Sequence, residues 1–199
     1  MVGAILTQNT SWGNVEKAIG KLKEKGLLCP AAIRAVPLEV LKETIRSSGY
    51  YKSKAIKLKR LAEFLQESYK DNIQAMSAKD PWDLRSELLK VWGIGPETAD
   101  SIVLYAAGLP MFVVDAYTKR LLSRLGVCPE EIGYDTCQAI FMENLDEDVP
   151  LFNEYHGLIV RHSKNTCRKM PLCSTCPLLD LCHTGHKIVT DSLETTAEA

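Results

Sequence analysis

Apolar residues recur at helical spacing along almost the whole chain, and this periodicity restricts the fold more than any other feature of the sequence. Leu58, Leu61, Ala62 and Leu65 follow the i, i+3, i+4, i+7 pattern that marks one buried face of a helix. Strand-like alternation bounded by turn residues is almost absent, and Met111–Val114 is the one run with the composition of a strand. The pattern therefore predicts an all-α protein of roughly eight to ten short helices.

The length and composition allow one domain or two small ones. The chain has 199 residues, of which 46% are apolar, enough to bury a substantial core. It contains no apolar run as long as the roughly 18–20 residues of a membrane-spanning helix, and its first residues do not resemble a signal peptide. We therefore expect a cytoplasmic protein without a membrane partner, in which the cysteines do not form disulfides. The polar residues 188–199 are expected to be a disordered tail.

Charge is unevenly distributed, although the net charge is only −1. Residues 42–60 contain seven basic residues and one acidic residue, a local charge of +6, and residues 127–154 contain eight acidic residues and no basic one. Such runs are usually the solvated faces of helices, but a basic face also suits the phosphates of a nucleic acid. Composition alone leaves both interpretations open.

Four cysteines lie close together in the stretch CRKMPLCSTCPLLDLC, with the spacing C-x5-C-x2-C-x5-C: Cys167, Cys173, Cys176 and Cys182. Thiolates bind soft metals, and a C-x-x-C pair brings two sulfurs to one centre. A structural zinc site usually has two C-x-x-C pairs, whereas a cubane iron–sulfur cluster needs one thiolate for each iron atom. The spacing favours an iron–sulfur cluster, with zinc as the alternative. The remaining cysteines are expected to be small core residues: Cys29, Cys128 and Cys137.

A Gly-x-Gly step, GIG at residues 93–95, separates two amphipathic stretches that both have helical spacing, and Pro96 stands at a suitable first helical position. A dinucleotide-binding loop would need a preceding strand and a third glycine, and both are missing. The turn could instead bind an anion through backbone N–H groups, because Gly93 and Gly95 have no Cβ to keep a phosphate away. The alternative is an ordinary interhelical turn that needs a positive φ.

Asp115 follows the apolar run MFVV and precedes a predicted helix. Aspartate is among the preferred N-cap residues, so a capping role alone would explain it. A carboxylate in this position can also be kept ionised by the helix dipole and directed into a cleft. Capping and catalysis are compatible.

The order of these motifs resembles that of the helix-hairpin-helix DNA glycosylases of the endonuclease III family. The stretches LTQNT, SSGYYKSKA, LLKVWGIGPETA, VVDAYTKRL and HGLIVRHSKNTC follow one another as in that family, from about Val2 to His183. The resemblance implies a helical barrel domain in residues 1–110 that ends in the helix-hairpin-helix, and a C-terminal helical domain in residues 111–187 with a 4Fe-4S loop. LTQNT and VVDAYT look closer to the 3-methyladenine glycosylase branch than to the branch that acts on oxidised pyrimidines.

The resemblance also implies roles for individual residues. Asp115 would be the catalytic carboxylate, and the four clustered cysteines would hold the 4Fe-4S cluster. Gln8 matches the residue that enters the gap left by a flipped base, and Tyr50 matches a second wedge. The residues expected to contact DNA are Gln8, Tyr50, Lys52, Lys54, Gly93 and Gly95.

The chain departs from the family pattern in three places. Bifunctional members carry a lysine in the second helix of the hairpin, whose amine attacks the sugar and forms a Schiff base, and Glu97 stands at that position here. The first gap between cysteines is one residue shorter than usual. The family's opening helix is missing before GAILTQNT, which indicates a truncated sequence or a variant without that helix. Because Glu97 cannot form an imine, we expect an enzyme that removes a base without the lyase step.

The expected protein is thus a monomeric base-excision-repair enzyme that binds double-stranded DNA with a damaged base, associates with the nucleoid when bound to DNA, and flips that base out. Ionised Asp115 would stabilise the positive charge that develops on the sugar and activate the attacking water. An alkylated purine is the expected substrate, because it is already positively charged and leaves easily. Three tryptophans could stack on it, although tryptophan is more often a core residue: Trp12, Trp82 and Trp92.

Three alternatives remain at this stage. One is a bifunctional endonuclease III-type glycosylase and lyase that acts on oxidised pyrimidines and uses another amine, such as that of Lys119, four residues after Asp115. The second is a non-catalytic protein that binds DNA damage, with the cluster and the hairpin retained for docking. The third is a zinc-stabilised interaction module.

Overall fold

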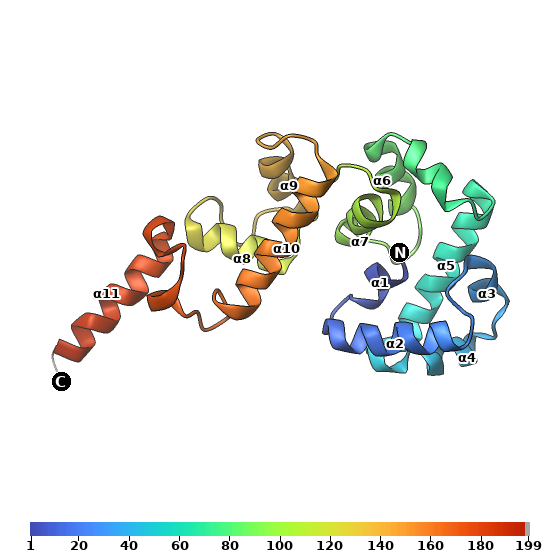
Figure 1. Ribbon diagram of the computed structural model, residues 1–199, viewed down its shortest axis with the longest axis horizontal. Helices are drawn as coiled ribbons and strands as arrows, with labels where there is room; N and C mark the ends of the chain where they lie inside the picture. Colours follow the sequence, from blue (N-terminus) through green and yellow to red (C-terminus); the bar gives the residue numbers. More distant parts are fainter. Residues whose placement is uncertain (198–199) are drawn as a thin grey trace. The chain divides into compact units, whose positions relative to one another are not determined.

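The computed structural model describes residues 1–197, apart from the side chains of residues 193 and 195–197. This part of the chain is helical and contains no β-strand, which confirms the all-α prediction (Figure 1). It contains eleven α-helices, more than expected, because helices of five to seven residues are too short to show a clear periodic pattern. The contacts divide the chain into an N-terminal unit, Met1–Met111, and a C-terminal unit that begins at Phe112.

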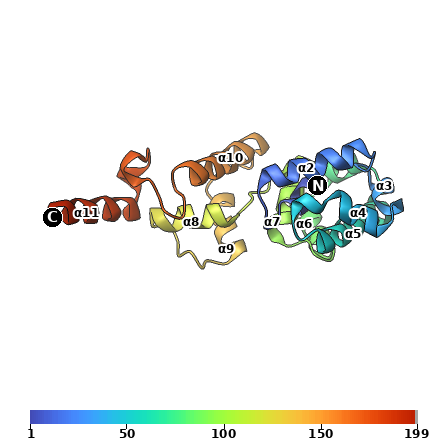
Figure 2. The same ribbon diagram turned by 90° about the horizontal axis from the view of Figure 1, so that it is seen from below.

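Seven α-helices build the N-terminal unit: α1 (Val2–Leu6), α2 (Trp12–Glu24), α3 (Pro30–Ala35), α4 (Leu38–Thr44), α5 (Tyr51–Tyr69), α6 (Pro81–Leu89) and α7 (Pro96–Ile102). Two 3-10 helices, η1 (Arg46–Ser48) and η2 (Ile73–Ala78), and a π-helix, η3 (Val103–Ala107), complete it. The longest helix, α5, contacts α1, α3 and α4, while α7 packs against α1 and α6 (Figures 1 and 2). Its apolar face supplies the buried Leu58, Leu61 and Leu65 to the core, as the periodicity predicts.

The helices α6 and α7 form the pair that the sequence predicts on either side of the GIG step. Asp80 caps α6 by accepting hydrogen bonds from the N–H groups of Trp82 and Asp83, and Pro81 occupies the first turn. The two helices are joined by an ion pair between Arg85 Nε and Asp100 Oδ1, at 2.8 Å, in which the aspartate side chain is fully buried. This pair fixes α7 against α6 and therefore fixes the turn between them.

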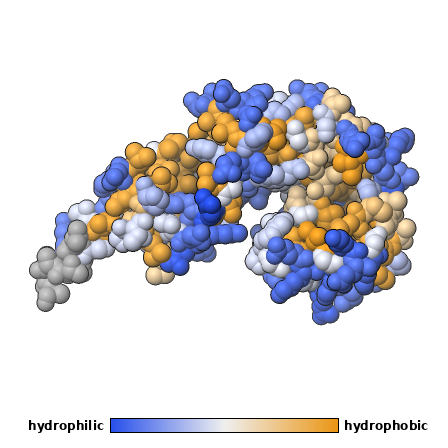
Figure 3. Space-filling model, viewed as in Figure 1, coloured by the Kyte–Doolittle hydropathy of each residue, from blue (hydrophilic) through white to orange (hydrophobic). Residues whose placement is uncertain are grey.

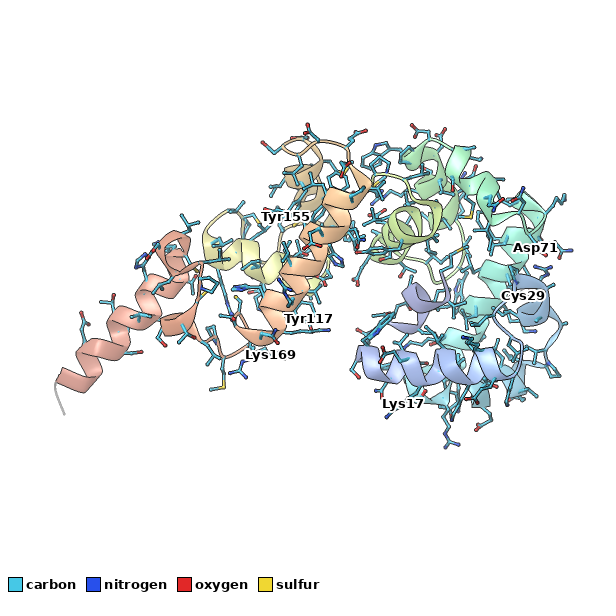
Figure 4. The ribbon with its side chains drawn as sticks, in the orientation of Figure 1. Lys17, Cys29, Asp71, Tyr117, Tyr155 and Lys169 are labelled. Carbon is cyan, nitrogen blue, oxygen red and sulfur yellow. The ribbon has the colours of Figure 1, made fainter. Side chains whose placement is uncertain are left out.

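The C-terminal unit contains α8 (Ala116–Leu125), α9 (Tyr134–Met142), α10 (Val149–Asn165), α11 (His183–Ala197) and the 3-10 helices η4 (Cys173–Thr175) and η5 (Leu179–Leu181). Its core is aromatic. The Phe112 ring stacks on Phe141 with ring centroids 3.8 Å apart and meets Phe152 and Tyr155 edge to face. Tyr155 is labelled in Figure 4, on α10. The run Met111–Val114 is buried but is not part of a strand, because its apolar side chains are packed by helices.

The polar C-terminal segment differs from the expected disordered tail of residues 188–199. Helix α11 extends across His183–Ala197, while residues 198 and 199 lie outside the described residues. After Gly185 the helix contains no glycine and no proline, so no residue interrupts its backbone hydrogen bonds.

No helix between residues 1 and 197 combines the length and the apolar character needed to cross a membrane. Figure 3 shows hydrophilic and hydrophobic residues mixed on the visible face of each unit.

Candidate functional site

The turn between α6 and α7 has the tight backbone that its two glycines indicate. Gly93 has a φ of +84°, a conformation that residues with a Cβ rarely adopt. A Cβ built at Gly93 would lie 2.6–2.9 Å from three carbons of the Lys57 side chain, so the stem of this lysine passes directly against the turn. Gly95 is the N-cap of α7, and a Cβ at this position would meet nothing within 4 Å. The turn thus has the positive φ of an interhelical connection and is open on the side of Gly95.

Glu97 lies in the first turn of α7 and is exposed. A carboxylate interacts favourably with the positive end of a helix, which accounts for glutamate at this position without a catalytic role. The α7 segment contains no lysine or arginine, so its own residues offer no amine that could attack a sugar.

Gln8 lies between α1 and α2, and its side chain reaches the hairpin. Its Nε2 donates to Thr98 Oγ1 at 2.9 Å and to the Gly93 carbonyl oxygen at 3.4 Å. Its Oε1 accepts a hydrogen bond from Lys57 Nζ at 2.5 Å. The structure therefore joins Gln8 to the hairpin and adds Lys57, which sequence reasoning did not single out. The sequence feature that could have indicated Lys57 is its position three residues after Lys54, because residues three apart lie on the same face of a helix.

Lys54 is buried, and the phosphate contact expected for it is wrong. The residue is 1% exposed, and its Nζ donates to the carbonyl oxygens of Leu6 at 2.9 Å and Ser48 at 2.6 Å. Burial lowers the pKa of Lys54 to about 8, with a smaller effect of a neighbouring positive charge. The side chain holds the backbone two residues before Gln8 and two residues before Tyr50. Lys54 therefore holds these two segments together, and its ammonium is not exposed to a phosphate.

Tyr50 and Lys52 lie at the exposed start of α5. Tyr50 is 71% exposed and has a φ of +45°, directly after Gly49 with a φ of +65°. A left-handed backbone is uncommon for a tyrosine, and such conformations cluster at functional sites. Lys52 is also exposed. The beginning of α5 therefore presents an aromatic ring and a positive charge to solvent.

Asp115 caps α8 and faces α10. Its Oδ1 accepts hydrogen bonds from the Thr118 N–H at 2.8 Å and the Thr118 hydroxyl at 3.0 Å, in a capping box. Its Oδ2 lies 3.6 Å from His156 Nε2, within the range of an ion pair. Both side chains are mostly buried. Asp115 thus has the capping role that the sequence indicates, and one carboxylate oxygen remains directed away from its own helix.

The surroundings of Asp115 keep its carboxylate ionised. Burial by itself would raise the pKa of Asp115, but the interactions with His156 and Thr118 outweigh it and hold this pKa below its usual value. His156 is a candidate site residue that sequence reasoning missed. It lies on a different helix far along the chain, and no local pattern connects it to Asp115.

Lys119 is engaged within its own unit, and the three tryptophans differ from the core role expected for them. The Lys119 Nζ donates to the Ile132 carbonyl oxygen at 2.6 Å and so holds the segment before α9.

Trp12, Trp82 and Trp92 are each about half exposed, so the preferred core role is wrong for all three. Of the isolated cysteines, Cys137 is a core residue, Cys128 is partly buried, and Cys29 is exposed.

The four clustered cysteines line one cavity in the C-terminal unit, together with Arg124 and His162. Arg124 Nη1 lies 3.3 Å from Cys167 Sγ and donates to the Arg168 carbonyl oxygen at 2.6 Å. The Gly185 N–H donates to Cys182 Sγ at 3.2 Å. A cation and a backbone N–H group thus both lie against sulfur atoms of this cavity.

The donor set of this cavity fits a soft metal or an iron–sulfur group, because all four thiols lead into the same space and a positive charge stands beside them. Burial, with the negative charges that neighbouring thiolates would carry, raises the pKa of Cys173. Among residues 1–197, no three side chains of histidine, cysteine, aspartate or glutamate already have the arrangement of a metal site. The loop therefore brings the right donors together without a finished coordination geometry.

The chain is similar to known DNA repair proteins over most of its length. Residues 2–147 match the family described as HhH-GPD superfamily base excision DNA repair protein. A provisionally named DNA repair glycosylase of Methanocaldococcus jannaschii is 51% identical over 183 residues, which cover 92% of this chain and 83% of that protein.

Two solved structures show the same fold. An endonuclease III in a non-covalent complex with DNA has a TM-score of 0.81 and 30% identity, covering 95% of this chain and 84% of that chain. A 3-methyladenine DNA glycosylase of H. pylori, bound to 1,N6-ethenoadenine, has a TM-score of 0.71 and 29% identity, covering 82% of each chain. The chain belongs to the HhH-GPD superfamily of base excision DNA repair proteins and is a DNA glycosylase of that family.

Proposed function

We propose that this protein is a monofunctional DNA N-glycosylase that removes an alkylated purine from double-stranded DNA and leaves an abasic site. The observation that carries the catalytic part is Asp115, a mostly buried carboxylate that Thr118 and His156 hold in its ionised form. A carboxylate in such surroundings suits a reaction in which positive charge develops on the substrate.

The proposed reaction begins when the damaged nucleotide leaves the base stack, which costs a few kcal/mol and costs least at a damaged base. As the bond between C1′ and the base nitrogen breaks, its electron pair leaves with the base, and positive charge develops on the sugar. Asp115 would stabilise this charge, as carboxylates do in glycoside hydrolysis. It would also orient the water that adds to C1′ and accept its proton. The products are the free base and an abasic site.

The absence of a lyase step is proposed from Glu97. A lyase needs an amine that attacks C1′ and forms an imine, and a carboxylate cannot do this. The bifunctional alternative would require Lys119, but its amine is already engaged with the Ile132 carbonyl oxygen. The non-catalytic alternative is less well supported, because Asp115 is both present and held in an ionised state.

The DNA contacts are proposed to come from the N-terminal unit. The turn at Gly93 and Gly95 would bind a phosphate through its backbone, and Lys52 would contact another phosphate. Gln8 would enter the gap left by the flipped base, with Tyr50 as the second wedge, since this ring is exposed at the start of α5. We expect a monomer, because flipping and hydrolysis of one base need one copy of each of these groups.

An alkylated purine is proposed as the substrate for a chemical reason. Such a base already carries positive charge, so it leaves without a strong general acid. The related H. pylori protein is named a 3-methyladenine DNA glycosylase, and its structure contains 1,N6-ethenoadenine, which supports a modified purine. The exposed Trp12, Trp82 and Trp92 are candidates to stack on a flipped base, because aromatic stacking suits any base.

A 4Fe-4S cluster is the proposed cofactor, held by Cys167, Cys173, Cys176 and Cys182, with zinc as the alternative. When bound, such a group cross-links the cysteine loop and adds its binding free energy to folding. The contacts of Arg124 with Cys167 and with the following backbone would support the loop around it. Iron and sulfide analysis of anaerobically purified protein distinguishes the two cofactors, since zinc without iron would exclude the cluster.

The reaction is tested with duplexes that each carry one defined lesion, in parallel assays of base release and strand nicking. We expect release of an alkylated purine and an unbroken strand until alkali is added. Reduction with borohydride during the reaction would trap any imine as a covalent protein–DNA adduct. Efficient trapping by the wild-type protein would contradict the monofunctional proposal, and its loss in Lys119→Ala would assign the lyase role to Lys119.

A further inference from the structure

The side chain of Gln8 is fully engaged inside the N-terminal unit. Its amide nitrogen donates to Thr98 Oγ1 at 2.9 Å and, more weakly, to the Gly93 carbonyl oxygen at 3.4 Å, while its amide oxygen accepts from Lys57 Nζ. A side chain that enters a DNA duplex must give up contacts of this kind. The hydrogen bond from Lys57 is the only one of the three that involves a charged group, so it is the strongest.

Lys57 connects this contact to the hairpin turn. Its Cγ, Cδ and Cε lie 2.6–2.9 Å from the point where a Cβ of Gly93 would be, so the absence of a side chain at Gly93 makes room for the lysine stem. The ammonium group therefore ends beside the turn, and Lys57 as a whole residue is partly exposed. A phosphate bound at the turn would present a charged acceptor to this ammonium, and such a bond is stronger than the bond to a neutral amide oxygen.

From these contacts we propose that Lys57 is a DNA-phosphate ligand that acts as a latch on Gln8. In the free protein, Lys57 holds Gln8 against the hairpin. When a DNA phosphate reaches the turn, Lys57 transfers its hydrogen bond from the Gln8 amide oxygen to the phosphate oxygen, and Gln8 is released towards the duplex. The proposal rests on the proposed function, because it takes Gln8 as the residue that enters the DNA.

The neighbouring lysine explains why Lys57 is free to change partners. Lys54, one turn earlier on α5, already holds the backbone of this region through the carbonyl oxygens of Leu6 and Ser48. The segment that carries Gln8 therefore keeps its backbone position when the hydrogen bond between Lys57 Nζ and the Gln8 amide oxygen breaks. Lys54 positions the chain, and Lys57 controls one side chain on it.

The phosphate contact is tested by the salt dependence of binding to an undamaged duplex. One phosphate contact contributes about 0.9 to the slope of log Kobs against log salt concentration. We expect Lys57→Met to reduce the slope by about this amount and Lys57→Arg to restore it. Lys59→Met is the matched control, because Lys59 lies on the same helix and its ammonium binds the carbonyl oxygens of Arg34 and Val36. An unchanged slope in Lys57→Met would overturn the proposal.

The latch itself is tested by NMR of the Gln8 side-chain amide, assigned by its loss in Gln8→Ala. In the wild-type protein this signal should shift when undamaged duplex is added. In Lys57→Met it should lie near its DNA-bound position before any DNA is present. If the Gln8 amide signal of DNA-free Lys57→Met has the same chemical shift as in the wild-type protein, Lys57 does not hold Gln8. The latch proposal would then be wrong, and only the phosphate contact of Lys57 would remain. Neither measurement depends on base release, so failure of the proposed enzymatic function would be seen separately, as an inactive protein with a normal Lys57 effect.

Discussion

The two units hold their candidate functional side chains in different ways. In the C-terminal unit, Asp115 is held chiefly by the end of its own helix, because two of its donors belong to Thr118, three residues further on. In the N-terminal unit, Gln8 is held by Lys57, Gly93 and Thr98, which are 49, 85 and 90 residues away along the chain. The carboxylate thus depends mainly on local geometry, with His156 as a tertiary partner, and the amide depends on tertiary contacts alone.

This difference agrees with the roles proposed for the two side chains. A group that stabilises charge in a transition state works best when it does not have to reorganise, and a capping box fixes it within one helical turn. A side chain that must leave its position on DNA binding is better held by partners on several elements, because each of these can exchange it for another hydrogen-bond partner. The following changes test this contrast, from the largest expected effect to the smallest.

Replacement Asp115→Asn should give the largest effect. Asparagine can still cap α8, so the fold should remain, but the negative charge that stabilises the sugar cation is lost. We expect the rate of base release to fall by about 10²- to 10³-fold while DNA affinity stays the same or increases. Single-turnover base release and a binding assay on the same duplex measure the two quantities.

Asp148→Asn is the matched control, since Asp148 caps α10 in the same unit by accepting from the Leu151 N–H. It should leave base release unchanged. Base release by Asp115→Asn at close to the wild-type rate would reduce Asp115 to a structural cap.

Replacement Lys54→Met should lower stability in the N-terminal unit. It leaves the carbonyl oxygens of Leu6 and Ser48 without their donor, at a cost of about 1–3 kcal/mol, which corresponds to several degrees in Tm. Thermal unfolding followed by circular dichroism measures this loss. Lys52→Met, on the exposed first turn of α5, should leave Tm unchanged. Equal Tm values for the two variants would mean that Lys54 does not hold this region.

Replacements in the hairpin turn should separate backbone strain from DNA contact. Gly93→Ala places a Cβ at a φ of +84° and against the Lys57 stem, so we expect a stability loss of about 1–2 kcal/mol as well as weaker DNA binding. Gly95→Ala meets open space at a φ of −94° and should weaken DNA binding alone. Denaturant unfolding and a binding assay distinguish the two. Normal DNA binding by Gly95→Ala would argue against a phosphate at this turn.

The smallest expected effect is the dependence of stability on pH that Asp115 contributes. Because its pKa is held below the ordinary value near 3.9, the stability gained from its ionised form is fully present above that value and is lost as pH falls through the folded pKa. The difference in unfolding free energy between wild type and Asp115→Asn should therefore be constant above about pH 5 and shrink below about pH 4. A difference that grows on acidification would contradict an ionised Asp115. His156→Gln should move the loss to higher pH.

Features that depend only on neighbouring residues could be predicted from the sequence. The buried face of α5 follows from the spacing of its leucines, the cap at Asp115 follows from its place before a helix, and the tight turn follows from Gly93. The family followed from the order of such local motifs. In each case the physical cause acts within a few residues: a helical repeat, an orphan N–H group or a backbone conformation that excludes a Cβ.

Tertiary packing alone decided what the individual side chains do. Lys52 and Lys54 belong to the same basic run, but only the tertiary fold shows that Lys54 is buried on two carbonyl oxygens while Lys52 faces solvent. Likewise, His156 beside Asp115 and Lys57 on Gln8 are pairings between distant elements. A lysine ammonium can be hydrated by water or hydrogen-bonded by carbonyl groups, and burial disfavours its charged form even when carbonyl groups surround it. Which of these surroundings it has depends on helices that are far away in the chain.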